Sequence, residues 1–329
     1  MNFQQLRIIR ETLRQDFNLT EVATALYTSQ PGVSKHIKDL EDELGIEIFV
    51  RRGKRLLGLT EPGKELAEVV DRILLDTQNL RRIADQFASR ETGHFVVATT
   101  HTQARYALPQ IIKWFKTDYP RVHLALHQGS PVEIGEKLVS GEADVGIATE
   151  RLDKVPELAT FPFYRWHHAL IVPHGHPLLQ VERMTLEVIG EYPIITYHEG
   201  FTGRTHIDKA FADAGVVPDI VLSAIDADVI KTYVELGLGV GIISSMAFNP
   251  ARDVGLRLLD CSRLFEKNIA WIAVRRGHYL RNFAYRFIEL CNPELSEGIV
   301  RGVASLAGGS PAPAPVSGPG EVFEDGGGI

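Results

Sequence analysis

The sequence predicts an α/β protein with an N-terminal winged helix-turn-helix, a long linker helix and a two-lobed α/β domain. Three observations predict this architecture: two short helical patterns within residues 19–44, one amphipathic helical pattern from residue 60 to about residue 88, and strands that alternate with helices from residue 93 onward. A chain of 329 residues is long enough for two or three domains. The expected segments are 1–60, 61–90 and 91–300, followed by a tail at 301–329.

Composition and charge narrow the class of protein. The chain is 44% hydrophobic and 23% charged and has no apolar run long enough to span a membrane. Its start, MNFQQLRIIRETLRQ, lacks the apolar core of a signal peptide, so we expect a cytoplasmic protein. Cys261 and Cys291 alone support neither a disulfide framework nor a cysteine-based zinc site. Because the net charge is −7, any contact with nucleic acid must depend on local clusters of Lys and Arg.

Residues 19–44 predict two helices joined by a tight turn, after a first helix over residues 3–13. Tyr27 and Thr28 form the turn, Ser29 can cap the second helix, and Pro31 fits its first turn because no N–H is needed there. An ordinary helical hairpin in a core would show the same apolar periodicity. The apolar positions at helical spacing are Leu19, Val22, Ala23 and Leu26 in the first helix of the pair and Val33, Ile37, Leu40 and Leu44 in the second.

The other face of the second helix carries groups that can contact DNA, as the second helix of a helix-turn-helix does. The segment IEIFVRRGKRLLGLT after Gly45 predicts a β-hairpin that turns at Arg52-Gly53, with basic residues at its tip. A solvated charged hairpin is the alternative. We expect Gln30, Ser34 and Lys35 at base edges or in the groove. We expect Thr28, Ser29, Arg51 and Lys54 at backbone phosphates, and Pro31 and Lys38 complete the predicted DNA surface.

A long helix is predicted from Thr60, its N-cap, to about Ala88. At about 25 residues it spans roughly 38 Å, and a single narrow apolar stripe on such a helix usually packs on a partner helix. This pattern favours a dimerising linker that pairs two recognition helices. The stripe consists of Leu66, Val69, Ile73, Leu80, Ile83 and Phe87.

Beyond residue 91, alternating strands and helices predict parallel α/β sheets in two lobes with a cleft between them. Short strands near 161–166 and 268–274 are expected to cross between the lobes. The tail beyond Arg301 is rich in Gly, Pro and Ala, so we expect it to be disordered. The expected strands are HFVVATT, VHLALHQG, ADVGIAT, HALIVP, PIITYH, DIVLSAI and GVGIIS.

At this point the chain resembles the LysR-type transcriptional regulators along almost its full length. The resemblance rests on the order SQPGVSKHI…LEDELGIEIFVRRGK…LTEPGKEL, followed by a long helix and a two-lobed domain. The family usually has Ala at Gly32 and Arg at Lys35, which leaves the base preference open. Segments such as ATTHTQARYALP, HQGSP, IATE, GFTGR and DADVIKTYVELGLGVGIISSMA are similar to the CysB branch, whose members regulate cysteine biosynthesis and sulfur metabolism.

The resemblance implies a periplasmic-binding-protein-like effector domain whose ligand is N-acetylserine, O-acetylserine, sulfate or thiosulfate. Thr99 to Gln103 follow a strand end, where N–H groups at a helix start, hydroxyls and an amide suit an oxyanion. Capping of helices and strand ends by Thr and Gln is the alternative for each residue. Residue by residue, the resemblance implies Thr100, Thr102, Gln103, Thr149 and Thr202 as effector contacts, Trp166 as a neighbouring wall and Arg204 as a charge partner.

No motif in the sequence indicates an enzyme or a cofactor. His167-His168 and His174-x-His176 lack a third ligand of fitting spacing, so no metal is expected. GLGVGIIS follows a helix rather than a strand, which excludes a dinucleotide fingerprint, and no nucleophile motif occurs. The expected partners are promoter DNA, a small-molecule or oxyanion effector and further copies of the chain in a tetramer, with RNA polymerase left open. The rival hypotheses are a LysR-type regulator with an unrelated effector, such as an aromatic acid, and a two-lobed solute-binding protein or enzyme.

Overall fold

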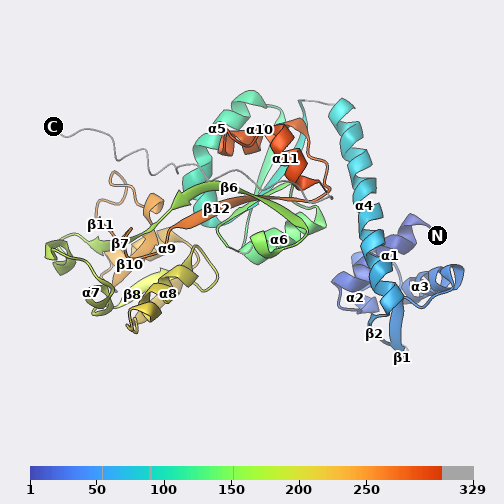
Figure 1. The fold of residues 1–329 in the computed structure, drawn as a ribbon, viewed down its shortest axis with the longest axis horizontal. Coiled ribbons are helices and arrows are strands. Elements are labelled where there is room, and N and C mark those ends of the chain that lie inside the picture. The colour runs from blue at the N-terminus through green and yellow to red at the C-terminus, as the bar shows by residue number, and fades with distance from the viewer. Residues whose placement is uncertain (54, 89–90, 151, 306–329) are drawn as a thin grey trace. The chain divides into compact units, whose positions relative to one another are not determined.

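The computed structural model describes residues 1–53, 55–88, 91–150 and 152–305. Its chain divides into two compact units, Met1–Asp85 and the chain from Gln86 onward. Figure 1 shows an N-terminal unit made of helices and one small β-hairpin, and a second unit built around two sheets. Each unit is described by itself below.

The N-terminal unit is the predicted winged helix-turn-helix. Asn18 caps α2 through the N–H groups of Thr20 and Glu21, and Ser29 caps α3 by accepting from the Gly32 N–H at 3.3 Å. Gly45, at φ +69°, ends α3 in the left-handed conformation that glycine adopts readily. The elements are α1 (Phe3–Arg14), α2 (Leu19–Ala25), α3 (Gln30–Leu44), β1 (Phe49–Arg52) and β2 (Arg55–Leu59).

Most of the apolar positions named from the sequence form the core of this unit, but the prediction is wrong for Leu44, which is 40% exposed at the end of α3. Val22, Val33 and Leu40 are fully buried, and they pack with Ile8 and Ile9 of α1. β1 and β2 pair antiparallel, with Arg52 opposite Arg55 at the turn, as the hairpin prediction requires. Hydrophobic burial on the inner faces of α2 and α3 therefore leaves the outer face of α3 available for recognition.

The linker helix α4 (Glu61–Ala88) begins where predicted, because the Thr60 hydroxyl accepts from the Gly63 N–H at 3.0 Å. Its apolar stripe is divided between two roles. Leu66 and Ile73 pack against the core of the N-terminal unit beside the buried Val70 and Leu74, so this part of the predicted seam is wrong. The remaining members, Val69, Leu80, Ile83 and Phe87, are exposed.

The second unit contains two five-stranded sheets, one in each lobe. Lobe I has the order β4-β3-β5-β12-β6 and lobe II the order β11-β7-β10-β8-β9. The strands of lobe I are β3 (Gly93–Thr99), β4 (Val122–Gln128), β5 (Val145–Ala148), β6 (Leu158–Trp166) and β12 (Asn268–Arg275). The strands of lobe II are β7 (His168–Pro173), β8 (Ile194–Tyr197), β9 (Ile220–Ala224), β10 (Val240–Ser244) and β11 (Leu256–Asp260).

Two connections link the lobes, as predicted. β6 leads through His167 into β7, and β11 leads back into β12. Parallel sheets were expected, but both sheets are mixed: β12 pairs antiparallel with β5 and β6, and β7 pairs antiparallel with β10 and β11. β7 and β12 follow the crossovers directly, without a helix that would return the chain to the same end of the sheet. Each therefore runs antiparallel to its neighbours.

Helices cover the sheets and separate the cores. In lobe I, α5 and α10 pack around Phe95, Phe115 and Phe287, while α6 covers the opposite face (Figure 1). The remaining lobe I elements are α5 (Leu108–Asp118), α6 (Pro131–Ser140), α10 (Asn282–Cys291), α11 (Glu297–Ala304) and the turns η1 (Gln103–Ala107) and η2 (Leu152–Lys154). Those of lobe II are α7 (Leu186–Gly190), α8 (Arg204–Asp213), α9 (Ala227–Glu235), η3 (Pro177–Gln180) and η4 (Ser245–Ala247).

The C-terminal boundary differs from the prediction. Arg301 to Ala304 belong to α11, which buries Val300 and Val303, so the expected disordered tail cannot begin at residue 301. The rest of the predicted tail, residues 306–329, lies outside the described residues. Among the described residues, no helix is both long and apolar enough to span a membrane.

Candidate functional site

The predicted DNA surface on α3 is available in the structure. Ser29, Gln30, Pro31, Lys35 and Lys38 are exposed, and Thr28 and Ser34 are half-buried. Pro31 in the first turn has no N–H, and the Gly32 N–H donates to Ser29, so the side chains of this face, rather than the helix start, offer most of the donors. This face therefore combines donors for base edges with lysine charges.

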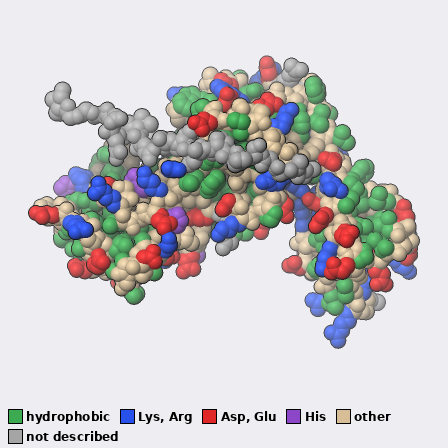
Figure 2. Space-filling model, viewed as in Figure 1, with side chains coloured by type: hydrophobic (Ala, Val, Ile, Leu, Met, Phe, Trp, Pro, Cys, Tyr) green, Lys and Arg blue, Asp and Glu red, His purple; other side chains and the backbone are tan. Residues whose placement is uncertain are grey.

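One residue of the wing, Arg51, makes a contact that the sequence did not predict. The Arg51 guanidinium donates to Glu41 at 2.7 Å, and the other oxygen of Glu41 accepts the N–H groups of Ile48 and Phe49. Arg51 thus links the wing to α3. The sequence predicted only a phosphate contact for Arg51, not this structural role. Lys54 lies outside the described residues. Arg52 and Arg55 are exposed at the hairpin turn, where Figure 2 shows basic side chains gathered.

Tyr27 is a surface residue that sequence reasoning treated only as part of the turn. Its side chain is 98% exposed, directly before Thr28 and Ser29, and its backbone has φ +51°. An aromatic ring at that exposure gains nothing from the core of its own domain. A positive φ at a non-glycine residue also carries strain that is often found at functional positions.

The predicted effector turn connects β3 to α5. Thr102 and Gln103 are 1% exposed, and Thr100 is 5% exposed. Gln103 opens η1, a single π-helical turn of a kind common at functional sites. Its amide oxygen accepts a hydrogen bond from the Tyr164 hydroxyl at 2.6 Å, and burial raises the pKa of that phenol, which stays protonated as a donor.

The two lobes meet at this turn. The Thr102 hydroxyl of lobe I lies 3.4 Å from the Thr202 hydroxyl of lobe II. Thr202 and Gly203 have φ of +45° and +71°, and a Cβ on Gly203 would lie only 2.4 Å from Asn268 Oδ1 and 2.8 Å from His168 Cε1. The loop that carries Thr202 is therefore pressed against the crossover strands, where only glycine fits.

Arg204 does not face the predicted effector position. It is 7% exposed, its Nη1 donates to the Tyr197 carbonyl at 2.6 Å and its Nε donates to Asp208 at 2.7 Å. These contacts fix the first turn of α8 within lobe II. The predicted charge partner is therefore a support of the loop, and the remaining site keeps its neutral donors.

His168 is a residue that sequence reasoning considered only for metal binding. Its Nε2 lies 3.1 Å from the Thr202 carbonyl and its Nδ1 lies 3.4 Å from Asn268 Nδ2. Burial lowers the pKa of His168 to about 4, so the ring is neutral at pH 7 and can donate to Thr202 while accepting from Asn268. It holds the Thr202 loop in place.

Three buried polar atoms around this loop have no hydrogen-bond partner among the described residues: Trp166 Nε1, Asn268 Oδ1 and Ser244 Oγ. Trp166 is directly opposite Asn268 across β6 and β12, and Ser244 is opposite His168 across β10 and β7. Leaving a buried donor or acceptor unpaired costs about 1–3 kcal/mol. Atoms arranged in this way suit a ligand that supplies the missing partners.

The predicted set is thus only partly brought together. Thr102 and Thr202 approach each other, Gln103 is held by Tyr164 in the same turn as Thr102, and the Trp166 ring packs edge-on against His168 at 4.9 Å. Thr100 precedes the turn, and the half-buried Thr149 follows β5. Tyr164, His168, Ser244 and Asn268 were missed because they come from distant strands and carry no local motif.

A second contact joins the lobes on the same turn. The Tyr106 hydroxyl donates to Asp228 at 2.7 Å, and Arg105 Nε donates to the same carboxylate at 3.2 Å. Lys231 forms an ion pair with Asp228 at 3.1 Å and also reaches the buried Asp253. The Asp228 carboxylate is therefore fully occupied by positive and neutral donors.

One group within the described residues has the ligand spacing for a metal: His101, Asp226 and Asp228. Asp226 caps α9 by accepting from the Val229 N–H, and Asp228 is held by Lys231 and the Arg105–Tyr106 pair. Nearby cations oppose a further positive ion, so the chemistry of this group does not favour a metal.

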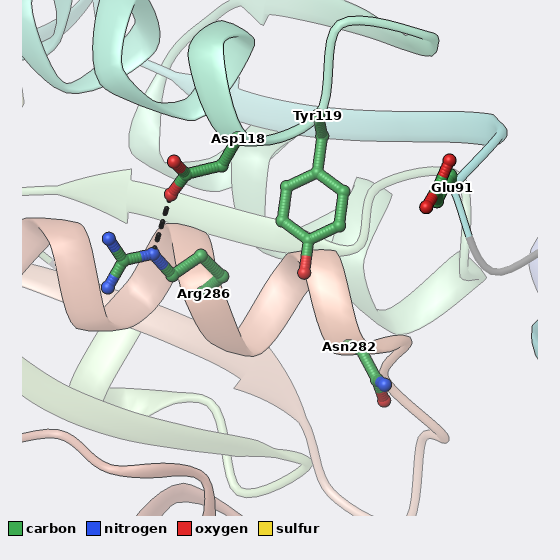
Figure 3. A pocket seen from close by; sticks show the side chains of 5 residues that line it. All are labelled: Glu91, Asp118, Tyr119, Asn282 and Arg286. Carbon is green, nitrogen blue, oxygen red and sulfur yellow. Dashed lines mark hydrogen bonds and ion pairs between the residues drawn. The ribbon is translucent and has the colours of Figure 1, made fainter.

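Two pockets lie away from these residues. One of about 410 Å³ is lined by Glu91, Asp118, Tyr119, Asn282 and Arg286 in lobe I (Figure 3). Its Asp118–Arg286 ion pair at 2.8 Å joins α5 to α10. The other, of about 300 Å³, lies beside α8 and includes the Lys209–Glu266 ion pair. Neither is lined by a residue of the predicted effector site.

The class of the protein follows from these two units and from its relatives. Residues 3–64 match the bacterial regulatory helix-turn-helix protein family, lysR type, and residues 88–296 match the LysR substrate binding domain. The chain belongs to the LysR family of bacterial transcription regulators and is not an enzyme.

Its relatives include named regulators. The chain is 61% identical over 303 residues to the HTH-type transcriptional regulator SsuR of Burkholderia cenocepacia, covering 92% of this chain and 98% of SsuR. It is 52% identical over 300 residues to CysB of the same organism, covering 91% and 96%. The solved cofactor-binding domain of the Cbl transcriptional regulator is 51% identical, with a TM-score of 0.62, covering 64% of this chain and 92% of that domain. These relatives confirm the predicted CysB branch.

Proposed function

We propose that this LysR-type regulator controls genes of sulfate assimilation and cysteine biosynthesis in response to a small ligand between the two lobes. The proposed effectors are N-acetylserine or O-acetylserine, and sulfate or thiosulfate. The observation that carries this proposal is the approach of Thr102 to Thr202, next to the buried Gln103 and near unpartnered, buried Trp166 Nε1 and Asn268 Oδ1. The names of the relatives, CysB and SsuR among them, agree with a sulfur-linked role.

The chemistry of the site favours a small polar anion over a large aromatic acid. Its groups near Thr202 include hydroxyls, an amide, an indole N–H and a neutral histidine, besides the Glu150 carboxylate on the Gly203 N–H, and the Arg204 guanidinium is occupied within lobe II. Neutral donors bind an oxyanion without the strong field of a fixed cation, so the ligand can also leave. This argues against the rival regulator with an aromatic acid as effector.

DNA binding is proposed for the exposed face of α3 and for the wing. Gln30, Ser34 and Lys35 are the proposed groove contacts, and Thr28 and Ser29 the proposed phosphate contacts. Arg52 and Arg55 join them at the wing. Since the operator lies in the cytoplasm, we propose that location for the protein, with RNA polymerase as a further partner at the promoter.

A homo-oligomer, with a tetramer as the proposed form, would pair these surfaces. Val69, Leu80, Ile83 and Phe87 leave 42%, 68%, 37% and 69% of their surface exposed on α4. Large apolar side chains repeated along one helix are costly in water and are usually covered by a partner helix. Paired heads would then read two half-sites.

The test is fluorescence anisotropy of a labelled promoter fragment from a sulfate-assimilation operon, at fixed ionic strength, without ligand and with N-acetylserine, O-acetylserine, sulfate or thiosulfate added in turn. Specific binding that the ligand modulates supports the proposal. Specific binding without modulation by any of the four ligands rejects the effector assignment. Binding no tighter than to an unrelated fragment of equal length rejects the promoter assignment.

A further inference from the structure

Glu150 reaches from lobe I into lobe II beside the proposed effector site. It follows Thr149 after β5, and one of its carboxylate oxygens accepts a hydrogen bond from the Gly203 N–H. Gly203 is the residue after Thr202, whose hydroxyl lies 3.4 Å from that of Thr102. The carboxylate therefore lies next to the threonines that are proposed to bind the effector.

The position that Glu150 occupies is suited to an anion. Gly203 is the N-cap of α8, a helix of 10 residues, and N–H groups at a helix start carry partial positive charge. A ligand that also carries a donor has a second group to bind here: Asn268 Oδ1, an acceptor in a side chain 1% exposed, has no partner in the described part of the chain. It lies 2.4 Å from the Cβ position of Gly203.

We propose that Glu150 determines which anions the effector site accepts, an inference that rests on the proposed function. Its carboxylate takes the anion position at Gly203 when no effector is bound. Sulfate and thiosulfate carry only acceptors and negative charge, so they face electrostatic repulsion there and must displace Glu150. A ligand that carries an N–H donor beside its own carboxylate can bind the threonines and donate to Glu150 at the same time. The site therefore selects small acylated amino acids over inorganic oxyanions.

Glu150 has a simpler alternative role. A carboxylate that caps a helix of the other lobe stabilises the contact between lobes, whatever ligand is bound. In that case removal of its charge would affect all ligands in the same direction. Opposite effects on two ligands are the property that only a specificity-determining group predicts.

The test is isothermal titration calorimetry of the full chain with sulfate and with N-acetyl-L-serine, at constant ionic strength. Glu150→Gln keeps the size of the side chain and removes its charge. Glu150→Asp keeps the charge but shortens the reach toward Gly203. Glu136→Gln is the matched control, because Glu136 is an exposed residue of α6 in the same lobe. Retained promoter binding verifies that each variant is folded.

We expect Glu150→Gln to bind sulfate about tenfold more tightly and N-acetylserine about tenfold more weakly than the natural chain. Glu150→Asp keeps the poor affinity for sulfate, and Glu136→Gln changes neither affinity. If Glu150→Gln shifts both affinities in the same direction or leaves sulfate unchanged, the proposal is wrong. An equal gain for sulfate in Glu150→Asp also overturns it, because the charge would then be irrelevant.

The same titrations separate this inference from the proposed function. If the natural chain binds neither ligand but Glu150→Gln binds sulfate, Glu150 is the selective group and the effector assignment is wrong. If no variant binds either ligand, both the effector assignment and the selective role of Glu150 are rejected.

Discussion

Replacing Tyr106 by phenylalanine removes a single hydroxyl from the contact between the lobes. That hydroxyl donates to the Asp228 carboxylate at 2.7 Å, and Tyr106 packs against the lobe II core. A hydrogen bond to a charged group contributes about 1.5–3 kcal/mol. Asp228 keeps its contacts with Lys231 and Arg105, and its side chain is 37% exposed, so we expect a smaller loss of about 1–2 kcal/mol.

Differential scanning calorimetry of the full chain measures this loss. For a domain of about this size, 1 kcal/mol lowers Tm by about 2–4 °C, so Tyr106→Phe is expected to lower the Tm of the effector-domain transition by about 2–8 °C. Tyr233→Phe is the control, because Tyr233 lies on α9 with Asp228 and its hydroxyl makes no hydrogen bond within the described residues. Equal Tm values for the two variants would refute the stabilising role of the Tyr106–Asp228 hydrogen bond.

The pH dependence of the stability difference between the natural chain and Tyr106→Phe tests whether that difference comes from the ionised Asp228 carboxylate. Burial raises the pKa of Asp228, but the hydrogen bonds from Tyr106 and Lys231 and the nearby positive charges outweigh it, so the pKa lies below the usual value. A carboxylate with a depressed folded pKa stabilises the fold above its unfolded pKa of about 3.9 and loses that contribution as pH falls through the folded value. The gap between the natural chain and Tyr106→Phe should therefore be constant near pH 7 and shrink below about pH 4.

Three further predictions concern the other parts of the site. His168 has a pKa lowered to about 4 by burial, so unfolding takes up a proton between about pH 6.5 and 4. In urea unfolding, the free energy of unfolding should fall by about 2 kcal/mol between pH 7 and pH 5. His168→Gln should abolish this pH dependence, whereas His174→Gln, at an exposed position, should keep it. Arg55→Ala should weaken binding to all DNA sequences and reduce the salt slope by about 0.9 in anisotropy titrations, whereas Arg263→Ala in lobe II should not. Thr102→Val should abolish the effector response and leave promoter affinity unchanged; loss of both would indicate a structural role.

Local pattern was sufficient to predict the N-terminal unit. Val22, Val33 and Leu40 are buried at the helical spacing that predicted them, and the caps Ser29 and Thr60 lie where side-chain oxygens meet helix starts. The direction of β12 and β7 was not predictable in this way. Strand direction at a crossover depends on which sheet the chain joins next, and a short apolar run carries no information about that choice.

The candidate site was predictable only where a motif holds its residues together. Thr100, Thr102 and Gln103 lie on one turn, so one motif identified all three. His168, Asn268 and Glu150 each reach the Thr202–Gly203 loop from a different strand or strand end, and no spacing in the sequence relates them. The role of Arg204 as a charge partner stays a prediction, and the sequence does not indicate that its guanidinium donates to the Tyr197 carbonyl.

The π-helical turn η1 gives the two lobes a common element. Gln103, at its start, contacts Tyr164 of lobe I, while Arg105 and Tyr106 within the same turn hold Asp228 of lobe II. Thr102, immediately before the turn, contacts Thr202. A ligand shifts an equilibrium between lobe arrangements only through contacts that differ between them. Thr100, Thr102 and Gln103 of the proposed ligand site lie in the same segment, residues 100–106, as Arg105 and Tyr106, which contact lobe II. A ligand that moves this segment therefore changes the contacts between the lobes directly, and no longer pathway through the lobe cores is required.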